Sequence, residues 1–138
     1  AVIRFKNGAV ATVEGTVNCF EDFEQTLTIF GEKGTVRLGG HYANKVDTWR
    51  FSDNLPEDDE TLAVDEKAKN VYGNGHTSLY ADFIDAIRNN RKPYVDLYVG
   101  KRVIEIVLAI YKSQKTGVPV KFPLKEFASV EMTGEFDR

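Results

Sequence analysis

The spacing of apolar residues changes along the chain, from alternation in the first half to helical spacing in the second half. Between residues 9 and 19 the odd positions are apolar or small, whereas the even positions from 12 onward are Thr12, Glu14, Thr16 and Asn18. Such alternation predicts a half-buried strand, because successive side chains of a strand point to opposite faces. Segregated strands and helices predict an α+β fold, with an open, mostly antiparallel sheet and two helices packed on one face.

Short glycine-containing turns separate the predicted strands. The segments 1–5 and 9–19 flank Lys6-Asn7-Gly8, and Asn-Gly is a strong hairpin signal because both residues tolerate positive φ. Further strands are expected at 24–30, 35–38 and 45–51, with glycine turns at 31–34 and 39–40. Tight turns predict antiparallel pairing.

An acidic segment divides the two halves of the chain. Residues 53–59 contain a proline and four acidic residues, a composition that favours a solvated loop. A brief strand is expected after it, at residues 62–64.

Two amphipathic helices are predicted in the second half. The first has Leu79, Phe83, Ile84 and Ile87 at helical spacing, with Thr77 or Ser78 as its start and Asn89-Asn90 as its end. The second is expected between the N-cap Asp96 and Gly117, after an extended link at Pro93. Its apolar positions predict a helix that is buried on most sides: Val99, Val103, Ile104, Ile106, Val107, Leu108, Ala109 and Ile110.

A final strand is predicted at residues 118–122. Because Pro119 has no amide hydrogen, this strand is expected at a sheet edge or paired on one side.

Composition excludes several classes of protein. The net charge of −3 argues against non-specific binding of nucleic acid, which needs a basic face. No apolar run approaches the ~20 residues that span a membrane. The single cysteine, Cys19, excludes an internal disulfide, suits a reducing cytosol and is expected to be a buried core thiol.

Three segments resemble the Gfo/Idh/MocA oxidoreductases (glucose–fructose oxidoreductase, inositol dehydrogenase and relatives). Residues 30–36, Phe-Gly-Glu-Lys-Gly-Thr-Val, resemble a strand–turn–strand of that family. Gly75-His76 with residues 79–87 and Pro93 resembles its first C-terminal helix, and residues 108–113 with Gly117 and Val120 resemble its last helix and strand. The order of these segments covers nearly the whole chain.

Within the family, residues 33–40, 44–46 and 49–51 most resemble the nucleotide-sugar branch, the WlbA/WbpB-like enzymes that oxidise a UDP-N-acetylglucosaminuronate. This resemblance implies an NAD- or NADP-dependent oxidation of a sugar hydroxyl in lipopolysaccharide or surface-glycan biosynthesis. It also implies a cytoplasmic homodimer or tetramer that assembles through the sheet.

The resemblance places the chemistry outside the chain. In the family, an N-terminal Rossmann domain binds the dinucleotide at a glycine-rich turn, and this sequence has no such turn. The family's catalytic His follows an Asp-x-x-x-His pattern, and His41 and His76 lie too far downstream to match it. Together with the start at Ala1 in mid-strand, this leads us to expect that residues 1–138 are a single C-terminal substrate-binding and oligomerisation domain. Such a domain has no catalytic residue, no cofactor and no dehydrogenase activity of its own.

Three residues are candidates for binding the sugar. His76 precedes a predicted helix, where an anion is favoured; it could instead pack or cap locally. Asn44, beside His41, could hydrogen-bond a sugar or a neighbouring subunit, although a solvated turn explains both residues more simply. Asn18, with Glu14, lies on the polar strand face, which could line the cleft or form a subunit interface.

Other polar residues favour structural roles. Asp82 and Asp85 share a helix face and could act as paired carboxylates, but a solvated face or an ion pair with Arg88 is the simpler interpretation. Glu105 is expected to reach solvent or Arg102. Two separated histidines and one cysteine give no metal-ligand spacing.

The alternative to an enzyme domain is a sugar-binding or assembly module without catalysis, because fold does not determine function.

Overall fold

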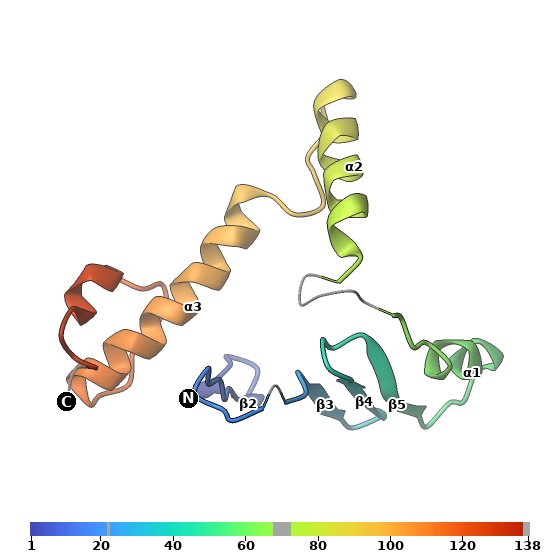
Figure 1. Cartoon of the computed structure of the whole chain (residues 1–138), viewed down its shortest axis with the longest axis horizontal. Coiled ribbons are helices and arrows are strands. Elements are labelled where there is room, and N and C mark those ends of the chain that lie inside the picture. Colours follow the sequence, from blue (N-terminus) through green and yellow to red (C-terminus); the bar gives the residue numbers. More distant parts are fainter. Residues whose placement is uncertain (22, 68–72, 137–138) are drawn as a thin grey trace. The chain divides into compact units, whose positions relative to one another are not determined.

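The computed structural model describes residues 1–21, 23–67 and 73–136, which form two compact units. Residues Ala1–Gly15 and Asp82–Arg138 form one unit, and Thr16–Ala81 form the other. Strands precede helices along the chain, and the ladders are antiparallel, which confirms the predicted α+β class (Figure 1). The strands form a two-stranded and a three-stranded sheet in place of one continuous sheet.

The three-stranded sheet has the order β3-β4-β5, as Figure 1 shows. It consists of β3 (Leu27–Gly31), β4 (Gly34–Gly39) and β5 (Lys45–Phe51), close to the predicted bounds. Both ends of β4 are glycines that β5 approaches closely. A Cβ atom on Gly34 would lie 2.3 Å from the ring of Phe51, and one on Gly39 would lie 2.0 Å from Asp47 Oδ2.

The predicted hairpin is formed by β1 (Val2–Arg4) and β2 (Val10–Thr12). Gly8 has a φ of 91°, as the Asn-Gly turn predicts. The long strand predicted at residues 9–19 is wrong beyond Thr12. The amide of Val13 still donates to Ala1 O (2.9 Å), but residues 13–19 are not part of a strand. Cys19 is exposed, so the prediction of a buried thiol is also wrong.

Helix α1 (Pro56–Leu62) replaces the predicted acidic loop. Pro56 occupies the first turn, where a missing amide hydrogen costs nothing, and three acidic residues in that turn favour the positive end of the helix dipole. Asp58 is buried and accepts from Trp49 Nε1 and from the amide of Leu55, both at 2.8 Å. Composition indicated a loop, whereas these contacts fasten the segment to β5.

The brief strand predicted at residues 62–64 is a single bridge instead. Leu62 ends α1, and Asp65 pairs with Lys45. The amide of Val46 donates to Val64 O (3.0 Å), which holds this segment beside the start of β5.

Helix α2 (Gly75–Arg88) begins before the predicted Thr77 or Ser78 and ends where predicted, with Asn90 at a φ of 49°. The predicted ion pair with Arg88 is wrong, because Arg91 takes that role. Its Nη2 donates to Asp82 Oδ1 (2.8 Å) and to Asp85 Oδ2 (2.6 Å). Asp82 Oδ2 also accepts from the amide of Tyr94 (2.7 Å), so this cluster fixes the chain as it leaves α2.

Helix α3 (Leu97–Thr116) has both predicted ends. The Asp96 side chain accepts from the amide of Val99 (2.9 Å), and Gly117 is left-handed with a φ of 71°. The prediction of a helix buried on most sides is wrong: Val103 is 59% and Ile104 is 62% exposed. The elements of its own unit cover only part of α3, where Ala109 is buried.

Residues 118–122 do not form the predicted strand. The Ser113 hydroxyl donates to Val118 O (3.0 Å), and Pro119 has no amide hydrogen, so little backbone is left for a ladder. The chain then folds back along the end of α3 (Figure 1). We name residues 123–136 the C-terminal strap; it includes the 3₁₀ helix η1 (Ser129–Met132).

Charged groups of α3 hold the C-terminal strap. Lys112 Nζ donates to the carbonyls of Lys125 (2.7 Å) and Glu126 (3.2 Å), and Lys115 donates to Glu131 O. Glu105 stays partly exposed to solvent, and its carboxylate also accepts from the amide of Leu124, a contact that the sequence did not predict. Met132 is buried. Backbone groups of the strap are thus satisfied by side chains of the helix.

We expect Asp58→Ala to lower the free energy of unfolding by about 2 kcal/mol, because the Trp49 indole and the Leu55 amide both lose an acceptor in a buried position. Urea unfolding followed by the fluorescence of Trp49, the single tryptophan, measures this change. Asp59→Ala, at an exposed position of the same helix turn, is the control. An equal loss in both variants would contradict the assigned role of Asp58.

The Asp82 cluster predicts a dependence on pH. The hydrogen bond from the Tyr94 amide, and then that from Arg91, holds the pKa of Asp82 below its ordinary value. A depressed folded pKa contributes stability that is complete above the unfolded pKa of about 3.9 and is lost as pH falls through the folded value. Asp82→Asn should therefore unfold at a lower temperature than the wild type at pH 6, and the gap should shrink below about pH 4.

Thermal unfolding followed by circular dichroism at a series of pH values measures this gap. Asp59→Asn is the control, since Asp59 is exposed on α1. The difference in unfolding temperature between wild type and Asp82→Asn could instead stay constant from pH 6 down to about pH 2.5, well below the ordinary carboxyl pKa. That result would show that ionised Asp82 does not stabilise the chain where it leaves α2.

Candidate functional site

The three predicted sugar-binding residues, Asn18, Asn44 and His76, all lie in the unit formed by Thr16–Ala81. The structure places them in different surroundings. Asn44 lies in a hydrogen-bonded turn, His76 lies in the first turn of α2, and Asn18 lies in an irregular segment before β3.

Asn44 holds the turn that connects β4 to β5. Its Oδ1 accepts from the amide of Tyr42 (3.1 Å), and its Nδ2 donates to the carbonyl of Glu66. Gly40, at a φ of 82°, leaves space for this amide, because a Cβ there would lie 2.9 Å from Asn44 Oδ1. Asn44 therefore stabilises the turn, as the simpler interpretation of the sequence expected, through the Tyr42 amide and the Glu66 carbonyl.

Glu66 connects this turn to the start of α2. Its amide donates to Asn44 O (2.9 Å), which pairs the two segments through their backbones. Its carboxylate Oε2 accepts from Asn74 Nδ2 at 3.5 Å. Asn74 comes two residues before His76, so Glu66 brings together two candidate regions that are far apart in the sequence.

A depression of about 220 Å³ lies beside these contacts. Leu38, Val46 and Val64 give it an apolar floor, and Asn44, Lys45 and Glu66 give it polar edges. Its mixed lining resembles that of small-molecule sites, but its volume is below the roughly 300 Å³ at which such sites begin.

His76 is exposed in the first turn of α2, with its ring centroid 6.3 Å from that of Tyr80. No residue of that turn is acidic, and the carboxylate described at the helix start is that of Glu66, which contacts Asn74. His41, the other histidine, lies against Tyr42 with ring centroids 4.5 Å apart. The two histidines thus belong to different local structures.

Asn18 is exposed, and its amide donates to Thr16 Oγ1 (3.1 Å). Because β2 ends at Thr12, Asn18 and Glu14 do not share the polar strand face that the alternation predicted. Their position outside a strand corrects that part of the sequence interpretation.

A charged cluster on β4 and β5 was missed by sequence reasoning. Arg37 pairs with Glu24 (2.8 Å) and with Asp47 (3.5 Å), and Lys45 pairs with Asp47 (3.2 Å). Arg37 pairs in register with Thr48, and the register shifts between Arg37 and Leu38, so alternation along the sequence does not by itself predict the contact with Asp47. The opposite charges balance, so the cluster favours a structural role.

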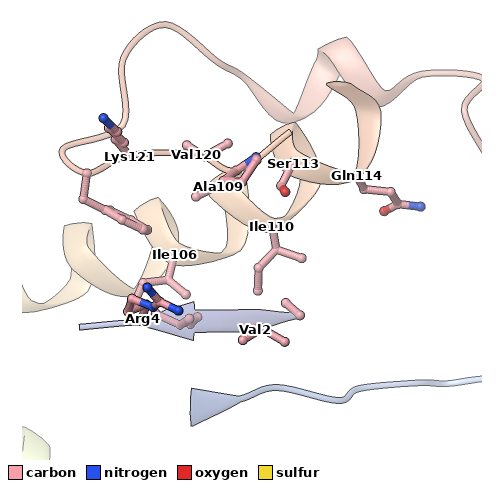
Figure 2. Close-up of a pocket in the computed structure, with 13 residues that line it drawn as sticks. Val2, Arg4, Ile106, Ala109, Ile110, Ser113, Gln114, Val120 and Lys121 are labelled. Carbon is pink, nitrogen blue, oxygen red and sulfur yellow. The ribbon is translucent and has the colours of Figure 1, made fainter. Parts of the chain in front are cut away.

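The other unit contains a larger, apolar groove of about 900 Å³. Figure 2 shows Ile106 and Ile110 of α3 facing Val2 and Arg4 of β1 across it. Residues 119–122 form another wall. With mostly aliphatic walls, this groove is suited to packing and offers little for chemistry.

The described ranges hold no group of three or more His, Cys, Asp or Glu side chains arranged for a metal ion. In the same ranges, no helix combines the length and apolar character that a bilayer crossing requires.

The chain matches known proteins in two comparisons. The family described as "Oxidoreductase family, C-terminal alpha/beta domain" (GFO_IDH_MocA_C) matches residues 1–122. The structure of the WlbA dehydrogenase from Bordetella pertussis in complex with NADH and UDP-GlcNAcA is 32% identical, with a TM-score of 0.74, over 90% of this chain and 36% of that chain. No curated protein matches the chain.

A second WlbA dehydrogenase, from Chromobacterium violaceum and also in complex with NADH and UDP-GlcNAcA, is 30% identical. Its TM-score is 0.75, over 91% of this chain and 34% of that chain. The chain therefore spans about a third of the length of these structures. Because the family match covers residues 1–122 across both compact units, the chain belongs to the Gfo/Idh/MocA oxidoreductase family, as its C-terminal α/β domain.

Proposed function

We propose that this chain is the substrate-binding and oligomerisation domain of an NAD-dependent dehydrogenase that oxidises a hydroxyl of a nucleotide sugar of the UDP-GlcNAcA type. The observation that carries the proposal is 32% identity over 90% of the chain with a WlbA dehydrogenase that binds NADH and UDP-GlcNAcA. The second WlbA structure, in complex with the same two molecules, supports it.

The proposed reaction divides its tasks between domains. Oxidation of a hydroxyl removes a hydride from carbon, which NAD accepts, and a proton from oxygen. This sequence has no glycine-rich turn for a dinucleotide, so the cofactor and the proton acceptor belong to an N-terminal Rossmann domain and the segment that follows it. The present domain would bind and orient the sugar.

His76, Asn44 and Asn18 are the proposed sugar-contacting residues. His76 is exposed in the first turn of α2, where backbone amides without an acceptor inside the helix favour a carboxylate or a phosphate of the ligand. Asn44 borders the depression, but its amide already serves the turn, so it would act mainly by shaping that wall. Asn18 is the weakest of the three, because its described contact is local.

Assembly and location complete the proposal. We propose a single domain over residues 1–138 that forms a homodimer or tetramer through its sheet, in the cytoplasm, within the synthesis of lipopolysaccharide or other surface glycans. Phe30 on the edge strand β3, 82% exposed, supports a contact there.

The full-length protein should reduce NAD in the presence of UDP-GlcNAcA, whereas the 138-residue chain alone should not. Absorbance of the reduced nicotinamide measures both reactions, and UDP-GlcNAc, which lacks the carboxylate, is the control substrate. Sugar binding by a full-length protein that never reduces NAD would favour a non-catalytic sugar-binding module.

In the full-length protein, His76→Ala should raise the KM for the nucleotide sugar about 10-fold, the effect of losing one hydrogen bond to a charged group. Asn44→Ala should act in the same direction through the turn, and Asn18→Ala should change KM by less than about 3-fold. Steady-state kinetics measures each value, and His41→Ala is the histidine control. A KM for His76→Ala equal to that of His41→Ala would remove His76 from the substrate contacts.

A further inference from the structure

Glu66 contacts two separate segments with different groups. Its backbone amide and carbonyl bond to Asn44, while its side-chain carboxylate accepts from Asn74 Nδ2 at 3.5 Å. The backbone contacts persist with any side chain at position 66. The carboxylate contact is therefore the part of this connection that depends on the identity of the residue.

The segment that precedes Glu66 is fixed in place. Val46 donates its amide to Val64 O (3.0 Å), and Asp65 forms a bridge with Lys45. Because both contacts use the backbone of β5, Glu66 extends from the edge of the sheet. A contact from such an anchored residue restrains its partner more than a contact between two loops would.

We propose that Glu66 is a positioning residue for the first turn of α2, and through it for His76. This inference rests on the proposed function, because it assigns the effect to a sugar-contacting His76. The carboxylate holds Asn74, Asn74 leads directly into Gly75, and His76 follows as the second residue of the helix. Glu66 itself borders the depression and acts through the helix start.

The test is a double-mutant cycle in the full-length enzyme. Glu66→Ala should raise the KM for UDP-GlcNAcA about 5-fold and change kcat by less than about 2-fold, the range of one exposed hydrogen bond. Glu66→Gln keeps an acceptor for Asn74 and should restore most of the loss. Asp65→Ala, on the neighbouring exposed residue, should leave KM unchanged.

If Glu66 acts through His76, the double variant Glu66→Ala/His76→Ala should have the KM of His76→Ala alone. If the KM of the double variant rises by the product of the two single effects, the proposal is overturned. An equal rise in KM for Glu66→Ala and Asp65→Ala would also overturn it.

Amide hydrogen exchange in the 138-residue chain separates this inference from the proposed function. Exchange at residues 79–81, the first amides of α2 whose acceptors lie within the helix, should be about 5-fold faster in Glu66→Ala than in Glu66→Gln or Asp65→Ala. Faster exchange in the Glu66→Ala chain, together with no dehydrogenase activity in the full-length protein, would support the positioning role and refute the proposed function. Unchanged exchange would refute the positioning role, whatever the enzyme does.

Discussion

Backbone pairing of β4 with two neighbours organises the unit that carries the candidate site. Close approach at its ends is possible because Gly34 and Gly39 have no side chains: Phe51 and Asp47 of β5 occupy the space that a Cβ would need. β5 in turn presents Trp49 to Asp58, which fastens α1, and presents its first residues to the segment that ends at Glu66. The candidate site therefore depends on the close pairing of β4 with β5, which Gly34 and Gly39 permit.

Polar contacts, more than a large core, fix the turns and corners of this domain. Asp58, Asn44, Asp82 and Asp96 each accept from one or more backbone amides where the chain changes direction. Several apolar side chains of α3 stay exposed within their own unit, Ile104 among them. A family domain that spans about a third of its relatives' length is expected to leave such faces for surfaces outside it.

The sequence predicted well those elements that are determined by residues close together in the chain. Strands β3 to β5, the Asn-Gly turn, the Asp96 cap and the Gly117 stop each follow from a few neighbouring residues. Helix α1 also has local signals, Pro56 and acidic residues in its first turn, but its composition favoured a loop. The contact between Asp58 and Trp49 that fastens it to β5 is not a local pattern. The same reason explains the site: Asn44 and His76 are visible in the sequence, but the connection between their segments through Glu66 is not.

The C-terminal strap has a consequence for where this domain ends. The family match stops at residue 122, yet the ammonium groups of Lys112 and Lys115 have their acceptors among residues 125–135. The folded unit thus extends beyond the matched residues. A chain cut after residue 122 would leave the ammonium groups of Lys112 and Lys115 without these acceptors.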